Sequence, residues 1–363
     1  MKVLHVEAGR HLYGGALQVL FLLQGLREAD PAGRHLLVCA PESAVAASAN
    51  QLQLPVRELA LGGEADLGAV PRLARLARNE GADLLHAHSR RGADLWTGLA
   101  ARLAGRPAVI TRRVDNPEAR ALVALKYRCY RHVITISEGI RKVLLSEGVP
   151  AAKLSCVPSA VDTVRYRPGA DRSALKAAFD IPDHAPVAGV IAQLIPRKGH
   201  QVLLEALPQV LAQQPRLQVL LFGRGPLEDE LKRQVRSRGL DHSVRFAGFR
   251  DDLERLLPAL DLVVHPALME GLGVALLQAS ACAVPVVAAR AGGIPEVVRD
   301  GENGRLVAPA DATGLARAML ELLGDRDLAR RMGARGRELV QDQFSIARMV
   351  AGNLAVYRMV LEG

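Results

Sequence analysis

Residues 269–281 decide the fold, and their sequence is Met-Glu-Gly-Leu-Gly-Val-Ala-Leu-Leu-Gln-Ala-Ser-Ala. Two glycines follow a charged residue and precede an apolar run, which is typical of a loop that turns into a buried helix. We therefore expect Glu270 in the turn, beside the unpaired N–H groups of the helix start, where phosphate binds readily. A carboxylate beside an anion site suits a ligand that carries hydroxyls as well as phosphates, and this combination indicates a nucleotide sugar.

The composition is typical of a soluble globular protein. The 363 residues are 49% hydrophobic and 23% charged, enough for two domains with a full core each. The four cysteines are scattered without a Cys-x-x-Cys pair, which favours a reducing compartment. Residues 271–289 contain no charged side chain and are long enough to cross a membrane. Gly271, Gly273, Gln278 and Pro285 interrupt that run, so we expect a short buried helix and a strand instead.

The net charge of +9 belongs mainly to the first half of the chain. Residues 1–160 hold 21 Lys and Arg against 14 Asp and Glu. The basic residues of one dense segment are Arg90, Arg91, Arg102, Arg106, Arg112, Arg113, Lys126, Arg128 and Arg131. Solvated helix faces account for much of this charge, and an anionic membrane surface or an acidic acceptor is a compatible partner. An aromatic content of 3% offers few base-stacking platforms, so we expect no nucleic acid.

Strands and helices alternate along the first half. We expect a strand at residues 2–8, a glycine loop at 9–15 and a helix at 16–26, then strands at 35–39, 83–86, 108–111 and 132–136. Helices at 70–79, at 93–103 and before residue 131 connect them. This order predicts a parallel sheet covered on both faces, with ligands beyond the carboxyl ends of its strands. The first glycine loop lacks Gly-x-Gly-x-x-Gly, which weakens an oxidoreductase interpretation.

The second half repeats the pattern from about residue 165. Strands are expected at 186–194, 217–222 and 285–289, with helices at 200–211 and from 227, and residues 311–363 are expected to be helical. The triplet Asp325-Arg326-Asp327 matches an Asp-x-Asp metal motif only superficially. It connects two helices away from any strand end, so we interpret it as a helix cap and expect no metal.

These motifs resemble those of the retaining glycosyltransferases of family four, also called group 1. The resemblance implies the GT-B fold, an α/β architecture of two doubly wound Rossmann-like domains with an interdomain cleft. It implies an N-terminal acceptor-side domain at residues 1–164 and a nucleotide-sugar-binding domain at 165–344. A last helix at about 345–363 would pack back on the first domain. The nucleotide sugar is the donor substrate, and no cofactor is implied.

The resemblance implies roles for three catalytic side chains. Glu270 would contact the donor sugar, Lys198 would face the donor diphosphate, and His88, at a strand end, would meet the sugar. Ser137 lies in a Ser-Glu turn like that of the family, although a helix-capping role is equally expected. The remaining donor-binding residues would be Gly14, Gly15, Gln193, Arg197, Gly223, Arg224, Gly248, Phe249, Gly271, Leu272, Gly273, Val274 and Gln278.

Two glutamines depart from the family pattern. The family carries a second glutamate eight positions after the first, for the ribose hydroxyls, and Gln278 stands there, roughly 12 Å further along the helix. The family also has an arginine at the position of Gln193. Charge builds on the diphosphate during transfer, so we hypothesise that Arg197 or Arg224 supplies the missing cation.

The expected activity is retaining transfer of a sugar to an acceptor hydroxyl, in lipopolysaccharide or other cell-envelope glycan synthesis. The basic first domain favours a lipid-linked or anionic glycan acceptor and peripheral membrane association, in the cytoplasm at the inner membrane face. Two alternatives stay open: a sugar-nucleotide epimerase of the same fold, and a non-catalytic nucleotide-sugar-binding protein whose Gln193 and Gln278 record lost catalysis. The sequence specifies neither the base nor the sugar of the donor.

Overall fold

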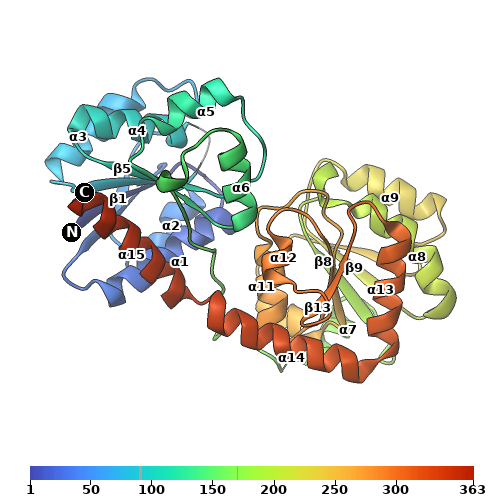
Figure 1. Cartoon of the computed structure of the whole chain (residues 1–363). Helices are drawn as coiled ribbons and strands as arrows, with labels where there is room; N and C mark the ends of the chain where they lie inside the picture. The colour runs from blue at the N-terminus through green and yellow to red at the C-terminus, as the bar shows by residue number, and fades with distance from the viewer. Residues whose placement is uncertain (90–91, 170) are drawn as a thin grey trace. The chain divides into compact units, whose positions relative to one another are not determined.

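The computed structural model describes residues 1–89, 92–169 and 171–363, and these form two compact units (Figure 1). The first unit comprises residues 1–160 together with 346–363, and the second comprises 161–345. The chain leaves the first unit after Ala160 and returns to it at Ile346. Arg90 and Arg91, which belong to the basic segment, lie outside the described residues.

The first unit contains a seven-stranded parallel sheet with the order β3-β2-β1-β4-β5-β6-β7. The strands are β1 (Lys2–Glu7), β2 (Arg34–Cys39), β3 (Val56–Glu58), β4 (Leu84–Ala87), β5 (Ala108–Arg112), β6 (His132–Thr135) and β7 (Leu154–Cys156). The order reverses between β1 and β4. In an open parallel sheet, ligands bind beyond the carboxyl ends of the strands at such a reversal.

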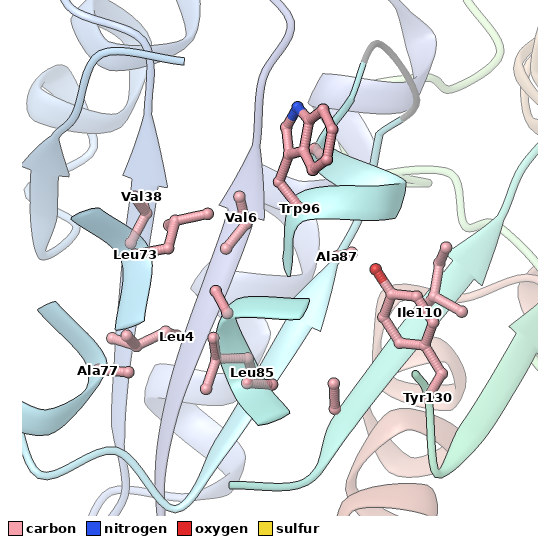
Figure 2. Packing of buried hydrophobic residues seen from close by; sticks show 14 of the residues in the cluster. Leu4, Val6, Val38, Leu73, Ala77, Leu85, Ala87, Trp96, Ile110 and Tyr130 are labelled. Atoms are coloured by element: carbon pink, nitrogen blue, oxygen red, sulfur yellow. The ribbon is translucent and has the colours of Figure 1, made fainter. Parts of the chain in front are cut away.

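Helices cover both faces of this sheet. They are α1 (Gly14–Ala29), α2 (Ala44–Gln51), α3 (Ala69–Asn79), α4 (Ala93–Ala104), α5 (Arg120–Tyr127), α6 (Glu138–Ser146), the 3-10 turn η1 (Ala151–Lys153) and α15 (Ile346–Glu362). On one face, Leu4 and Val6 pack with Leu73 of α3 and Trp96 of α4 (Figure 2). On the other face, Val3 packs against α1 and α15. Side chains alternate along a strand, so His5 shares the face of Val3.

The second unit contains a six-stranded parallel sheet with the order β10-β9-β8-β11-β12-β13. Its strands are β8 (Val187–Ile191), β9 (Gln218–Phe222), β10 (Val244–Gly248), β11 (Leu262–His265), β12 (Val286–Ala289) and β13 (Gly304–Val307). Its helices are α7 (Arg172–Ala178), η2 (Pro196–Lys198), α8 (His200–Gln213), α9 (Glu228–Ser237), α10 (Leu253–Leu256), η3 (Leu257–Ala259), α11 (Val274–Ala281), α12 (Ile294–Val297), α13 (Ala312–Gly324) and α14 (Arg326–Gln343). The order reverses between β8 and β11, where the loops with Lys198 and Glu270 begin.

The alternation of strands and helices, the parallel sheets and the α/β class are confirmed. Residues 271–289 form α11 and β12, as expected, and no helix in the described part of the chain is both long and apolar enough to cross a membrane. Asp325 caps α14 by accepting bonds from the N–H groups of Asp327 and Leu328, which confirms the cap interpretation. The sequence reasoning interpreted residues 244–249 as a loop, whereas residues 244–248 form the strand β10. It also missed a set of short elements, which are α2, β3, α6 and β7 in the first unit and α7, α10, β11, α12 and β13 in the second.

One expectation about the first glycines was wrong. Gly14 and Gly15 were expected in a loop, but they are the first two residues of α1. The extended residue before the helix is Tyr13, at φ −83° and ψ 173°, so the turn ends one residue before the glycines. Glycine disfavours a helix interior but is tolerated in the first turn, where its N–H needs no intrahelical partner.

Candidate functional site

The loop between β11 and α11 forms the first part of the site. Gly273 immediately precedes α11 and has φ +96°, a left-handed conformation that favours glycine. Leu272 is buried beside it and anchors the turn. The helix therefore begins at Val274, and its first hydrogen bonds run from the N–H groups of Leu276 and Leu277 to the Gly273 carbonyl at 2.9 and 3.2 Å, so the N–H groups of Val274 and Ala275 precede the helical bonding pattern.

Glu270 is held by three donors from this end of the sheet. Its Oε2 accepts a hydrogen bond from His265 Nε2 at 2.8 Å and forms an ion pair with Lys198 Nζ. Its Oε1 accepts the N–H of Gly271 at 3.1 Å. The side chains of Lys198 and Glu270 are only 11% and 14% exposed. The two catalytic residues expected in the second half are thus in direct contact.

The charge state of this cluster follows from its contacts. Burial opposes ionisation of Glu270, but the hydrogen bond from His265 and the positive charge of Lys198 outweigh it and hold the pKa of Glu270 well below its ordinary value of 4.5. Burial lowers the pKa of His265, despite the neighbouring Glu270 carboxylate. At neutral pH, Glu270 is therefore an anion and His265 a neutral donor. A permanently ionised carboxylate accepts hydrogen bonds from hydroxyls and does not act as a general acid.

His265 was missed by the sequence reasoning. It is the last residue of β11, five positions before Glu270, and a polar residue at the end of a short apolar run was the available signal.

Gln278 occupies the buried side of α11. Its Nε2 donates to the Tyr166 hydroxyl at 3.0 Å. Burial raises the pKa of Tyr166 to about 12, so this hydroxyl keeps its proton. One N–H of the Gln278 amide is therefore engaged by Tyr166, a residue that the sequence analysis did not single out.

Three further loops follow neighbouring strands at the same end of the sheet. Gln193 and Arg224 are exposed after β8 and β9, and Arg197 is half-buried. The N–H of Leu194 donates to the Arg224 carbonyl at 3.1 Å, so these two loops are tied together. Gly223 has φ +140°, and a Cβ there would lie 2.0 Å from the Ala192 carbonyl oxygen, which explains the glycine.

The loop after β10 completes this end of the sheet. Gly248 has φ +69°, and the Phe249 side chain after it is exposed. Since all six strands are parallel, the loops that carry the donor-binding residues expected in the second half lie at one end of one sheet, and only Gln278 lies further along α11.

The first unit contains a separate cavity at the carboxyl ends of β1, β4 and β5. Its volume is about 300 Å³. The lining residues are Glu7, Gly9, Arg10, His11, Tyr13, Gly15, Ala16, His88, Ser89, Asp94, Ile110, Thr111, Arg112, Arg113, Val114, Lys126 and Tyr127. Of the residues predicted in this half, His88 and Gly15 line the cavity and Gly14 does not. Ser137 caps α6 by accepting the N–H of Ile140 at 3.1 Å.

The cavity is rich in cations. Glu118 pairs with both Arg112 and Lys126, and two backbone carbonyls also accept from Arg112. Burial lowers the pKa of Arg113 to about 10, although Glu7 and Tyr357 oppose the shift, so Arg113 is charged at neutral pH. Its Nε has no hydrogen-bond partner among the described residues. Arg113 therefore offers an unused donor beside the cavity.

His88 belongs to a buried group of imidazoles. Its Nε2 lies 3.0 Å from His5 Nδ1, and His5 Nε2 lies 3.2 Å from His35 Nδ1. His86 lies beside them and is bonded to the hydroxyls of Tyr357 and Thr111 at 2.6 and 2.7 Å. Nitrogens of His5, His86 and His88 lie within 4.8 Å of one another, close enough for these three side chains to hold a metal ion. Of this group the sequence analysis named only His88, and its expectation that no metal binds stays a prediction.

Two family models match the chain in succession. The model described as Glycosyltransferase Family 4 matches residues 14–165, and the one described as Glycosyl transferases group 1 matches residues 171–339.

Two curated relatives share part of the sequence. A GDP-mannose-dependent alpha-(1-6)-phosphatidylinositol monomannoside mannosyltransferase of Mycolicibacterium smegmatis is 34% identical over 229 residues, 58% of each protein. The lipopolysaccharide core biosynthesis glycosyltransferase LpsE of Rhizobium meliloti is 37% identical over 170 residues, 47% of this chain and 49% of that one. The chain thus spans about half the length of these relatives.

A solved structure matches the whole chain. The Anabaena protein HepE, crystallised with UDP and glucose, superposes with a TM-score of 0.87 over 99% of both chains at 24% identity. This similarity shows that the fold is GT-B.

Proposed function

Because the chain belongs to the group 1 glycosyltransferases of family four, we propose that it transfers a sugar from a nucleotide-sugar donor to an acceptor hydroxyl. The observation that supports this most is the cluster of Lys198, His265 and Glu270 before α11. The ionised carboxylate offers acceptors to sugar hydroxyls, while Lys198 and the start of α11 offer positive potential to a diphosphate. A nucleotide sugar carries both groups.

Lys198 keeps donors for the diphosphate while it is paired with Glu270. An ammonium group has three N–H donors, and Glu270 uses one. Negative charge grows on the diphosphate as the glycosyl bond breaks, so a cation placed there stabilises the transition state more than the ground state. Gln193 stands where the family has an arginine. Arg197 and Arg224, at the same end of the sheet, take over the role of that arginine. These side chains supply the positive charge, and we propose no metal in the transfer step.

We propose that transfer proceeds with retention. The acceptor hydroxyl attacks from the side of the leaving phosphate, and a phosphate oxygen takes the hydroxyl proton as the new bond to the sugar carbon forms. We propose no protein nucleophile, and a lone pair that remains on the Glu270 carboxylate accepts a hydrogen bond from the sugar. The role of Glu270 is to orient the sugar.

The cavity of the first unit suggests an acceptor with negative charge. Arg10 and Arg113 line it, and Arg113 has an unused donor. The similarity to a phosphatidylinositol monomannoside mannosyltransferase and to LpsE agrees with a lipid-linked or anionic glycan acceptor. We therefore propose a role in cell-envelope glycan synthesis, at the cytoplasmic face of the membrane and through peripheral association.

A panel of nucleotide sugars tests the proposal. GDP-mannose, UDP-glucose and ADP-glucose are compared by thermal shift, since a ligand at a hundred times its Kd adds about 2.7 kcal/mol of stability. The stabilising donor is then incubated with candidate acceptors, and products are weighed by mass spectrometry. A donor that stabilises the protein and gains an acceptor supports the proposal. Full turnover by Glu270→Ala, or an absence of stabilisation by every donor, contradicts it.

A non-catalytic binding role is the second candidate, because Gln278 uses its amide to bind Tyr166 where the family has a charged group. Such a protein would be stabilised by a donor without consuming it. An increase in turnover by Gln278→Glu would support impaired catalysis. An epimerase would change the donor without adding to its mass, so the same spectra distinguish it.

A further inference from the structure

A line of four side chains crosses the sheet of the first unit beneath α1 and α15. It begins at Asp30, which follows α1, where His35 Nε2 lies 3.2 Å from Asp30 Oδ2. It continues from His35 on β2 to His5 on β1, and from His5 to His88 after β4, with nitrogen-to-nitrogen distances of 3.2 and 3.0 Å. The line ends at the cavity, which His88 lines. It thus connects a carboxylate at one end of the sheet to the cavity at the other.

The positions of the protons in this line follow from the carboxylate of Asp30 at its first end. A carboxylate is ionised at neutral pH and only accepts hydrogen bonds, so the Nε2 of His35 must carry a proton. A neutral imidazole has one donor and one acceptor, so the Nδ1 of His35 accepts from the Nε2–H of His5. By the same reasoning, the Nδ1 of His5 accepts from the Nε2–H of His88. His88 is then left with a lone pair on Nδ1.

The neutral state of the rings is supported by their burial. His5 and His88 are fully buried, and burial lowers the pKa of each well below 6.5, with neighbouring imidazoles and, for His88, Arg113 adding to the shift. Burial also lowers the pKa of His35, against the effect of Asp30. Every ring in the line is therefore uncharged at neutral pH, as the alternation of donors and acceptors requires.

The last nitrogen of the line has no hydrogen-bond partner within residues 1–89, 92–169 and 171–363. His88 Nδ1 is buried and makes no hydrogen bond to any described residue. A buried acceptor without a hydrogen-bond partner destabilises the folded protein. A buried polar atom of this kind is typical of a site where a ligand supplies the missing hydrogen bond.

We propose that Asp30, His35 and His5 are positioning residues that fix His88 as the tautomer with its proton on Nε2 and an accepting lone pair on Nδ1. The lone pair accepts a hydroxyl of the sugar substrate, and this last step alone rests on the proposed function. A metal ion held by His5, His86 and His88 is the competing interpretation. It would have to displace the bonds that already engage the ring nitrogens of His5 and His86.

Ring-nitrogen NMR of the full-length protein tests the tautomer without measuring activity. Spectra that correlate the ring nitrogens with the carbon-bound ring protons distinguish the two tautomers, and His88→Gln assigns the His88 signals. We expect His5, His35 and His88 all to carry the proton on Nε2. His132, bonded to Ser155 at 2.8 Å, lies outside the line and serves as the internal reference. A proton on Nδ1 of His88 in the wild-type protein overturns the proposal.

Substitution of Asp30 by a hydrogen-bond donor should reverse the tautomer of every ring in the line. Asp30→Lys places a donor where the acceptor stood, so every ring must invert and His88 must carry its proton on Nδ1. The amide of the Asp30→Asn variant can accept or donate a hydrogen bond, so this variant should give the NMR signals of both tautomers. The matched control is Asp83→Asn, a carboxylate of the same unit that accepts from the Lys2 N–H at 2.7 Å and has no link to the line. Spectra of both Asp30 variants that remain like those of Asp83→Asn overturn the proposal.

Two further measurements separate the alternatives. Zinc added to the wild-type protein should leave the ring signals unchanged, whereas a joint shift of His5, His86 and His88 would show a metal site and overturn the proposal. In transfer assays, Asp30→Asn should lower kcat/KM by up to about tenfold, the effect of one hydrogen bond, and Asp83→Asn should not. If no transfer exists in any variant, the proposed function fails while the NMR result still decides the tautomer.

Discussion

The Gln278 amide donates a hydrogen bond of 3.0 Å to the Tyr166 hydroxyl, inside the second unit and at the position where the family carries its second glutamate. Tyr166 is buried, and its raised pKa of about 12 keeps the hydroxyl protonated. The Tyr166 hydroxyl can therefore rotate. It accepts a hydrogen bond from an amide and would donate one to a carboxylate.

We expect Gln278→Glu to change the free energy of unfolding by less than about 1 kcal/mol, because the Tyr166 hydroxyl satisfies the new carboxylate. In a Tyr166→Phe background the same change should cost about 2 kcal/mol, since the buried carboxylate loses its donor. Urea unfolding of the four proteins measures the difference. Equal costs in both backgrounds would show that Tyr166 does not support this position.

The ion pair of Lys198 and Glu270 should be strongly coupled. Lys198→Met leaves a buried carboxylate with one fewer donor and should cost about 3 kcal/mol of stability. The double variant Lys198→Met with Glu270→Gln should recover part of that loss, because no charge remains to be compensated. A double-mutant cycle in guanidinium chloride checks this, and simple additivity would count against the pairing.

Acid should weaken the second unit through Glu270. Its folded-state pKa lies below the ordinary 4.5, so its stabilisation is complete above about pH 4.5 and is lost as the pH falls from there toward the lower folded value. Glu270→Gln removes this dependence. The stability difference between wild type and Glu270→Gln, measured by urea unfolding from pH 7 to pH 3, should therefore shrink toward acid. A constant difference would falsify the depressed pKa.

Gly199 and Gly239 form a matched pair with φ of +67° and +66°. A Cβ on Gly199 would lie 1.9 Å from the Pro266 carbonyl oxygen, whereas Gly239 has open space around it. Gly239→Ala should cost about 1 kcal/mol from the left-handed backbone alone, and Gly199→Ala at least about 3 kcal/mol. Thermal unfolding compares the two variants. Similar losses of stability would mean that the loop that begins at Pro266 moves easily to accommodate the new Cβ.

Arg197 and Arg224 should share the charge on the diphosphate. Each Arg-to-Ala change is expected to lower kcat about tenfold, while Arg236→Ala on α9 leaves it unchanged. Steady-state kinetics with the donor that the thermal-shift panel identifies measures this. If both changes leave turnover untouched, neither arginine replaces the family's cation at Gln193.

The sequence predicted the α/β fold well because strand, turn and helix follow one another along the chain. Glu270 and Lys198 were predicted individually, and their ion pair joins two loops that only the parallel pairing of β8 and β11 brings together. His5 was missed because it looks like an ordinary member of an apolar strand. Its importance comes from the register that places it opposite His86, and a single sequence does not contain that register.

The return of the last helix to the first unit has a consequence for synthesis on the ribosome. Val350, Leu354 and Tyr357 complete the core beneath β1, and Tyr357 also supplies the hydroxyl that binds His86. None of these residues is synthesised until the whole second unit has been made, so one apolar face of the nascent first unit stays uncovered while the second unit emerges. A truncation that removes α15 would therefore damage the first unit more than the second unit, which directly precedes that helix in the chain.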